Sequence, residues 1–359
     1  ADVADNAITS ISSGRGGNGG GSAFMNGGGG GNGGTVAAIE FIGVWTTTWS
    51  SRNWIDGLSG GPGGNGGDGA LFDGAGGAGG EAYGVFTWGA TDVDATSNTI
   101  QNVLAGSGGN STSGAGNNGG GFGGRATGIA INGVLGAAQL QSNMITSILA
   151  GDGGQGAVGG SGGNATGILS IGDSNFNSTF VTGSSIQDIS GGDGAVGFRN
   201  GGNAGTAAGI ISAFVSPFLA WNGIWTLSGG DGGNAIDGTN GGRPGDAIGE
   251  AFFMVPNAWS AGSWINSVQK GLPGFGPPTQ PAFATGYYVE GTSSFTSQLT
   301  MENGTLLNIE DRDIWVANEA IGTTINTPFQ TSKIAVQATS ILYVMNYLST
   351  SVYWSDGFT

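Results

Sequence analysis

The stretch ILAGDGGQGAVGGSGGNATGIL, from Ile148 to Leu169, places a glycine-dominated run between two short apolar segments. Glycine loses more conformational freedom on folding than any other residue, so a single run of this kind is typical of a flexible linker. Here the same arrangement returns along the chain at nearly constant spacing. The sequence therefore has to be analysed as a repeat before anything else.

Two landmarks define the repeat. The first is I-x-x-(I/L/V), a small residue and then glycine, and its leading isoleucines are Ile8, Ile55, Ile100, Ile145, Ile186, Ile224 and Ile265. Their successive separations are 47, 45, 45, 41, 38 and 41 residues. The second landmark follows each glycine run and reads A-x-G before apolar residues, with its glycines at Gly84, Gly128, Gly167, Gly209, Gly249 and Gly286. Two landmarks with one period indicate a repeat architecture.

Between A-x-G and the next glycine run, each copy contains three short segments rich in Ile, Val, Thr, Phe and Leu, separated by Gly, Asn, Asp or Ser. These compositions favour strands and tight corners. Three strands per copy predict one coil of a parallel β-helix, in which the isoleucines stack as an internal apolar ladder. The asparagine that precedes the isoleucine suits a left-handed corner and a stacked hydrogen-bonded ladder. The alternative is a β-sandwich with long glycine loops and hairpin turns such as NG.

The glycine runs come in pairs separated by a short tip, as in an excursion that goes out and returns. Within them G-G-x repeats with period three, the period of a polyproline II helix. Such a helix has two glycine columns, through which neighbouring main chains approach closely and hydrogen-bond. We therefore expect the arms to leave the same corner of every coil and to pack as a polyglycine II bundle. The alternative is a set of disordered, solvated loops.

The arms resemble the polyglycine II bundles of phage tail-fibre adhesins and of one class of insect antifreeze protein. The three-segment coils resemble the right-handed parallel β-helix repeats of secreted and surface proteins. These resemblances imply an all-β solenoid and, as functions, adhesion, coat formation or glycan cleavage. They are architectural and transfer no functional residue to this chain.

Composition limits the function. The chain has 359 residues, 80 of them glycine, and a formal net charge of −16 with only eight Lys and Arg. That balance disfavours nucleic acid and anionic membrane surfaces as partners, and no apolar run is long enough for a membrane span. Cysteine and histidine are absent, so neither disulfides nor Cys/His chemistry is expected. The start at Ala1 suggests a processed N-terminus, and four sequons are candidate glycosylation sites of an extracellular protein: Asn110, Asn164, Asn177 and Asn303.

Glycine becomes rare after residue 290. We therefore divide the chain into glycine-rich solenoid repeats, about seven of them, over 1–290 and a glycine-poor, β-rich cap or assembly segment over 291–359. Residues 334–348 fit a cap helix or paired strands. Open coils at the two ends invite stacking between subunits, and the candidate assembly positions are Ile8, Ile11, Ile334, Val336, Ile341 and Val344.

Other chemistry is weakly indicated. Carboxylates gather at Glu310–Asp313, where the alternatives are a local ion pair and a lyase-like site. Gly63–Leu71 matches a calcium-binding β-roll pattern without its tandem copies. Tryptophans cluster in pairs and triplets, which favours core or interface packing over glycan stacking. We predict no catalytic residue, no cofactor and no metal.

The sequence therefore predicts a secreted, non-enzymatic structural protein that self-associates into a head-to-tail filament or surface appendage. The alternative is an adhesin of a virus or cell surface, whose variable arm tips bind a glycan or another cell-surface receptor. Ice binding and glycan cleavage are lesser hypotheses.

Overall fold

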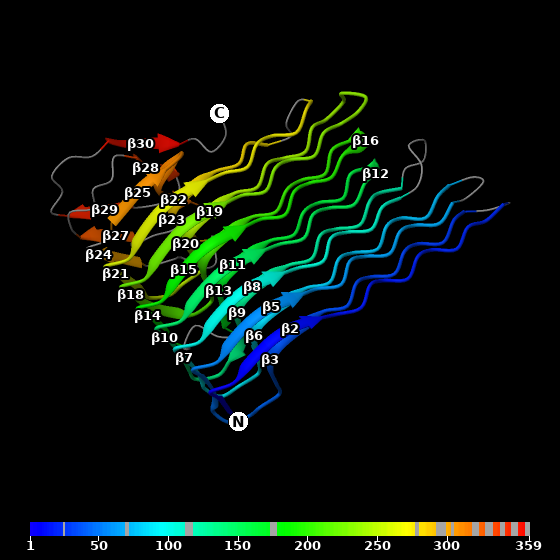
Figure 1. Cartoon of the computed structure of the whole chain (residues 1–359). Helices are drawn as coiled ribbons and strands as arrows, with labels where there is room; N and C mark the ends of the chain where they lie inside the picture. Colours follow the sequence, from blue (N-terminus) through cyan, green and yellow to red (C-terminus); the bar gives the residue numbers. More distant parts are fainter. Residues whose placement is uncertain are drawn as a thin grey trace.

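The computed structural model describes residues 1–23, 26–68, 72–111, 118–172, 178–276, 280–291, 299–302, 305–317, 323–326, 333–337, 342–345 and 351–355. Over these ranges the chain is all-β and contains no helix. Its strands stack from the N-terminal end, blue in Figure 1, to the C-terminal end, red, and long arms project from one side of the stack.

Three sheets form the stack, and we number them by the order in which the chain first visits them. Sheet 1 contains β1 (Asp2–Ala4), β4 (Thr48–Ser51), β7 (Val93–Thr96), β10 (Ala137–Gln141), β14 (Ser178–Thr182), β18 (Ser216–Ala220), β21 (Ala258–Ala261), β24 (Leu299–Glu302), β27 (Thr323–Asn326) and β29 (Leu342–Met345). Sheet 2 contains β2 (Ala7–Ser12), β5 (Trp54–Ser59), β8 (Thr99–Leu104), β11 (Met144–Leu149), β15 (Ser185–Ser190), β19 (Gly223–Ser228), β22 (Trp264–Gln269) and β25 (Thr305–Ile309).

Sheet 3 contains β3 (Val36–Ile42), β6 (Ala82–Trp88), β9 (Ala126–Val134), β13 (Ala165–Gly172), β17 (Ala207–Ala213), β20 (Ala247–Phe253), β23 (Ala284–Glu290), β26 (Arg312–Ala317), β28 (Lys333–Gln337) and β30 (Ser351–Ser355). A small additional pair, β12 (Gly156–Val158) with β16 (Gly197–Asn200), lies within the arms.

From β1 to β26 each coil passes through sheets 1, 2 and 3 in turn, and beyond β26 the described strands belong to sheets 1 and 3. Strands pair in parallel with the equivalent strand of the next coil, as β5 does with β8 and β6 with β9. Stacked parallel strands confirm the all-β, β-helix-like prediction. The β-sandwich alternative is wrong, because its hairpins require antiparallel neighbours.

The predicted isoleucine ladder is present. Ile55 is paired with Ile100, and Ile100 with Ile145, and all three are fully buried. In a regular strand, residues i and i+3 face opposite sides, so I-x-x-(I/L/V) needs a bend. The residue just before the second apolar position supplies it, because Asn102, Ser147 and their equivalents have a positive φ near 55°. The left-handed residue turns both apolar side chains into the core.

The A-x-G glycine packs against the same ladder. A Cβ on Gly128 would lie 2.6 Å from Cγ2 of Ile145, and one on Gly167 would lie 2.5 Å from Cγ2 of Ile186. Because each glycine faces the next isoleucine along the chain, the two sequence landmarks have one period for a steric reason.

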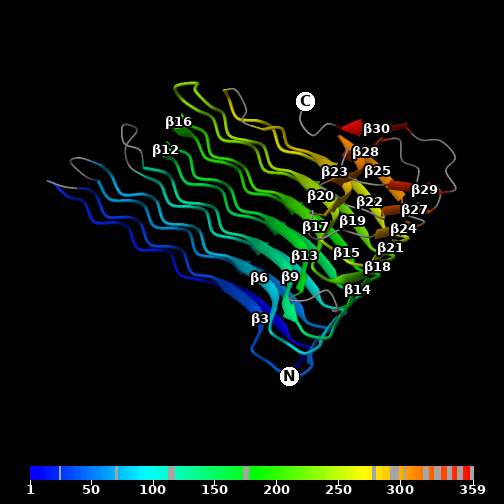
Figure 2. The ribbon, with the colours of Figure 1, turned by 180° about the vertical axis from the view of Figure 1, so that it is seen from behind.

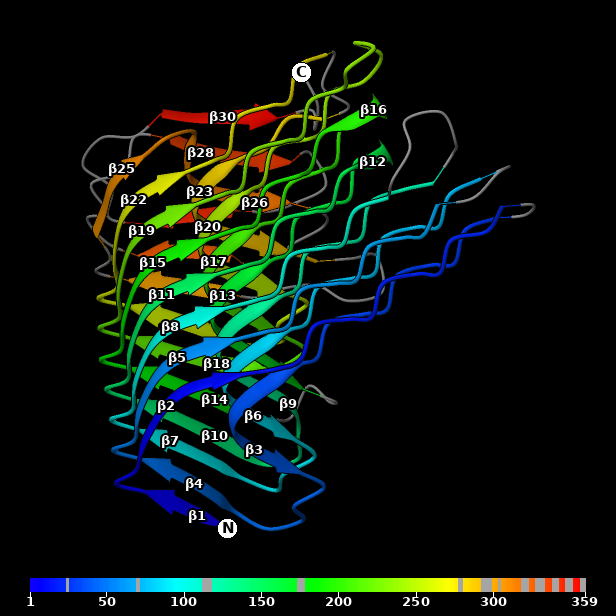
Figure 3. The same ribbon diagram turned by 45° about the vertical axis from the view of Figure 1, so that its right-hand side comes forward.

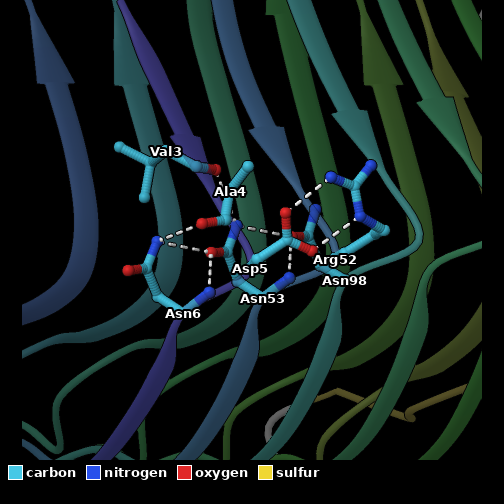
Figure 4. A network of polar contacts seen from close by, with 7 residues as sticks. All are labelled: Val3, Ala4, Asp5, Asn6, Arg52, Asn53 and Asn98. Carbon is cyan, nitrogen blue, oxygen red and sulfur yellow. Dashed lines mark hydrogen bonds and ion pairs between the residues drawn. The ribbon is translucent and has the colours of Figure 1, made fainter.

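The predicted asparagine ladder also forms, at the corner between sheets 1 and 2 (Figure 4). Asn53 Nδ2 donates to Asn98 Oδ1 at 3.0 Å and to the carbonyl of Val3 at 2.9 Å, and Asn98 Nδ2 donates onward to Asn143 Oδ1 at 3.2 Å. The expectation of left-handed asparagines is wrong. The preceding residue takes that conformation, as at Arg52 with φ 52°, which leaves the asparagine side chain free to point inward.

Beyond residue 290, β24 to β30 extend the same three sheets. Ile334 and Val336 lie in β28, and Val344 lies in β29, so the cap-helix alternative is wrong for the described part of 334–348. Ile341 lies outside the described residues. The division of the chain at residue 290 stays a prediction.

Candidate functional site

Seven arms leave the stack at one corner, where sheet 2 passes to sheet 3 (Figures 2 and 3). Their described parts are 13–23 with 26–35, 60–68 with 72–81, 105–111 with 118–125, 150–164, 191–206, 229–246, and 270–276 with 280–283, and these parts lie side by side as a layer in both views. The prediction that every arm leaves from the same corner is confirmed.

Backbone hydrogen bonds join the outgoing segment of an arm to its returning segment, and they join both segments to those of the next arm. These bonds recur every three residues along the arm. In the first arm, Gly16 and Gly19 donate to the carbonyls of Pro62 and Asn65 on the next outgoing segment. Gly31 on the returning segment donates back to Gly17 across the layer. The two segments of an arm thus hold each other and their neighbours through main-chain groups.

In the arms that follow the first one, two of the three columns have no room for a side chain. A Cβ on Gly109 would lie 2.0 Å from the carbonyl oxygen of Gly64, and one on Gly64 would lie 2.1 Å from that of Gly17. Real Cβ atoms do not approach carbonyl oxygens this closely, and backbone on both sides cannot give way. Glycine is therefore required here by contact and not by turn geometry.

The third column points outward, and several of its side chains are polar and accept backbone N–H groups of the next arm. Asn110 Oδ1 accepts from Gln155 N at 2.8 Å, and Asp193 Oδ1 accepts from Asp231 N at 2.7 Å. Burial, together with the neighbouring charges of Asp152 and Asp231, raises the pKa of Asp193. The stacked aspartates were not predicted, although aligning the repeats on their isoleucines would have placed these residues in one column.

Two of the predicted sequons lie in this column. Asn110 and Asn164 are both exposed, and the Oδ1 of Asn164 accepts from Thr206 N at 2.9 Å. Asn177 and Asn303 lie outside the described residues. Glycosylation stays a prediction.

The first coil exposes the edges of all three sheets, since β1, β2 and β3 stand at the end of their sheet orders. Ile8 and Ile11 lie on this edge in β2 and are half-buried, whereas the isoleucines that follow them in the ladder are buried. The arm layer is open at the same end, where a Cβ on Gly14, Gly17 or Gly20 would meet nothing within 4 Å.

At the other edge of the arm layer, the seventh arm lacks some of the N–H donors that the preceding arms use. The register of β19 and β22 puts Lys270 and Pro273 where the preceding arm has Gly229 and Gly232, whose N–H groups donate to the following arm. Proline has no N–H, and Lys270 N donates instead to Glu310 Oε2 at 3.1 Å. The seventh arm therefore offers fewer donors to a further arm.

Large apolar side chains are exposed at the distal ends of several arms: Phe72, Phe198, Ile236 and Phe275. Tryptophans are also exposed on the coil, with Trp45 and Trp221 more than 70% accessible. Trp45 lies between β3 and β4, and Trp221 lies between β18 and β19, so neither of them packs in the core. Packing at an interface, the other half of the expectation, stays a prediction.

The carboxylates of Glu310 and Asp311 are engaged in structural contacts. Lys270 Nζ lies 2.6 Å from Asp311 Oδ1, and the other oxygen of Asp311 accepts from Ala284 N at 2.9 Å. The side chain of Asp313 lies outside the described residues. Over the residues that the structure describes, no group of three or more Asp or Glu side chains is arranged to hold a metal ion.

No protein-family model and no curated protein matches the chain. Among solved structures, a TibC-catalysed, hyper-glycosylated TibA fragment aligns over 98% of this chain and 100% of its own, at 11% identity and a TM-score of 0.11. At that score the alignment carries no argument. Separately, no helix in the described ranges combines the length and apolarity needed to cross a membrane.

Proposed function

We propose that this chain is an extracellular structural protein that assembles head to tail into a filament or surface appendage. The observation that carries the proposal is the open first coil, where β1, β2 and β3 each have only one partner among the described strands. Unpaired strand edges bind further strands readily. The last described strands at the other end of the stack, β29 and β30, belong to sheets 1 and 3. Contact between the two ends joins unlike surfaces and continues without closing.

We also propose that the arms form a polyglycine II bundle. Hydrogen bonds with period three, two columns closed to side chains and one outward column support this assignment. One arm by itself does not offset an ordering cost of about 1–2 kcal/mol per residue. Seven arms held in register by the coils supply each other's partners, and the result is a stiff plate along one side of the filament.

The filament proposal is tested at the strand edge. In a strand, the backbone groups of successive residues point alternately to the two neighbouring strands. Because the carbonyl of Asn6 accepts from Trp54 N in β5, the N–H of Thr9 points the other way, to the side of β2 that has no described strand. Thr9→Pro removes that donor and Thr9→Ala keeps it, which makes them a matched pair. We expect fibres from the parent and from Thr9→Ala in negative-stain microscopy at rising concentration, and discrete particles from Thr9→Pro. Discrete particles from all three would refute assembly.

The exposed apolar residues at the arm ends support a second candidate, an adhesin that binds a cell-surface receptor or glycan. Ile236 is 68% exposed and Phe275 is 73% exposed, on neighbouring arms. We expect the double variant Ile236→Ser, Phe275→Ser to lose attachment to target cells or glycan arrays and to keep its sedimentation behaviour. Unchanged attachment would remove this candidate.

A further inference from the structure

A groove of about 440 Å³ lies where the outer face of sheet 3 meets the returning segments of the arms. It crosses several coils, from Asn164 at the end of one arm to Phe283 at the end of the last arm and Trp315 in β26. The strands that form its floor, β13, β17, β20 and β23, are seen side by side in Figure 2.

The floor of the groove is apolar. It is made by outward-facing side chains of sheet 3, among them Leu169, Ile211 and Ile248. Ile211 and Ile248 are only half-buried, so the floor is accessible from outside.

One end of the groove is aromatic. The rings of Tyr288 and Trp315 lie 5.0 Å apart, and those of Phe283 and Trp315 lie 4.5 Å apart, both edge to face. The Arg312 guanidinium stacks on this cluster, with its Cζ 4.3 Å from the Phe283 ring centroid and 4.4 Å from that of Trp315. The aromatic end therefore carries a fixed positive charge.

Three buried polar atoms at this end have no hydrogen-bond partner among the described residues: Arg243 Nε, Arg312 Nη1 and Thr285 Oγ1. Arg243 and Thr285 line the groove, and Arg312 stacks on two residues that line it. Arg243 Nη2 donates to both oxygens of Asp246, at 2.8 and 3.0 Å, and these bonds leave Nε without an acceptor. A buried donor without a partner costs about 1–3 kcal/mol, so such a set favours a ligand that brings acceptors.

The charge distribution points the same way. The chain has only eight basic residues and a net charge of −16, yet Arg125, Arg243 and Arg312 all lie at or beside this groove. Guanidinium groups bind carboxylates in particular, through charge-assisted hydrogen bonds. An apolar floor leading to such donors suits a molecule with an anionic head and an apolar body.

We propose that the groove binds an amphipathic carboxylate, with its head at Arg243 and Arg312 and its aliphatic body along Leu169, Ile211 and Ile248. This site lies on the side of the stack, away from the open first coil, and is independent of filament assembly.

The test is calorimetric titration of the full chain with decanoate, 1-decanol and acetate. We expect decanoate to bind and 1-decanol to bind at least about tenfold more weakly, because a neutral head forms no charge-assisted bonds. Acetate should show no saturable binding, since it lacks the apolar body. Equal affinities for decanoate and 1-decanol would overturn the anionic head, and absence of decanoate binding would overturn the site.

Variants then locate the bound molecule. Arg243→Gln and Ile211→Asp should each weaken decanoate binding about tenfold or more. Arg15→Gln removes a positive charge from an exposed position in the first arm and serves as the matched control, with binding unchanged. Should Arg243→Gln lose its fold in circular dichroism, Thr285→Val tests the same end. Equal binding by every folded variant would place the ligand elsewhere and overturn the proposal.

Discussion

The coil stack and the arm layer are built from the same repeats but are stabilised in opposite ways. In the coil, each repeat contributes buried apolar side chains, and Ile100, Ile145 and Ile186 lie in one continuous ladder. In the arms, the equivalent interior positions are glycines whose carbonyls and N–H groups bond directly to neighbouring main chains. The coil therefore depends on the volume of its side chains and the arms on their absence. Cavities weaken the first, and added atoms weaken the second.

The largest expected effect is that of a cavity in the coil. Ile145→Ala removes a fully buried side chain in the middle of the ladder, and large-to-small core changes of this kind cost about 2–5 kcal/mol. We expect a loss of about 4 kcal/mol in chemical denaturation, with one cooperative transition. A loss below about 1 kcal/mol would mean that the ladder does not dominate the stability of the coil.

The next effect tests the arm layer with a single methyl group. Gly109→Ala should cost on the order of 3 kcal/mol, because its Cβ would lie 2.0 Å from a backbone oxygen. The matched control is Gly17→Ala, at the equivalent place in the first arm, where nothing lies within 4 Å. We expect this control to leave the midpoint of denaturation nearly unchanged. Similar midpoints for both variants would contradict close packing of the arms.

Protection from amide hydrogen exchange in the same pair of variants shows where the damage lies. Gly109→Ala should lower protection in the arms on either side of it more than in the ladder strands. Uniform loss across the molecule would show that coil and arms unfold as one unit, and the distinction between them would then apply to packing only.

A third prediction concerns a carboxyl group inside the coil. Glu250 is fully buried in β20, where the neighbouring coils have Ile210 and Tyr287, and it accepts hydrogen bonds from Ser260 and Ser263. Burial raises its pKa from 4.5 to about 7. The folded protein therefore keeps this proton where the unfolded chain has lost it. Stability is highest below pH 4.5, falls as the pH rises to 7 and is constant above that.

Between pH 4.5 and pH 7 we expect the free energy of unfolding to fall by about 3 kcal/mol. Denaturation of the parent and of Glu250→Gln at pH 4, 5.5, 7 and 8.5 measures it, and the substitution should remove most of the slope. A parent as stable at pH 8.5 as at pH 4 would show that the interior solvates this carboxylate better than its burial indicates. Charged residues are only 9% of the chain, so few other groups titrate. Burial also raises the pKa of Asp193 and of Asp246, which adds a smaller pH dependence of the same sign.

The smallest of the four effects concerns the polar ladder at the coil corner. Asn98→Ala removes an amide that bonds to Asn53, Asn143 and the carbonyl of Ser50. It leaves buried groups without partners, at a cost of about 2 kcal/mol in thermal or chemical denaturation. The loss of unfolding free energy in Asn98→Ala should be smaller than that in Ile145→Ala and larger than that in Gly17→Ala. A neutral result would show that water replaces the amide and that the ladder is not needed.

Much of the coil could be predicted from the sequence, because both landmarks report direct steric contacts. Ile145 recurs with its period because it stacks on its equivalents, and Gly128 recurs because it faces Ile145. The asparagine ladder followed from the same alignment. The error over its corner arose because Ser97 and Arg52, which precede the asparagines, carry the left-handed conformation although neither is a residue type that favours it.

The exposed tryptophans and the groove could not be predicted in the same way. Residues of one outer face are dispersed over strands about 40 residues apart, so no local pattern brings Arg243, Phe283 and Trp315 together. The sequence by itself determined the repeat, its three strands per coil and the apolar interior, since those depend on residues that recur at the same position. Only the tertiary structure decided which outward side chains meet across coils and which edges remain open, because these depend on how far successive coils and arms overlap.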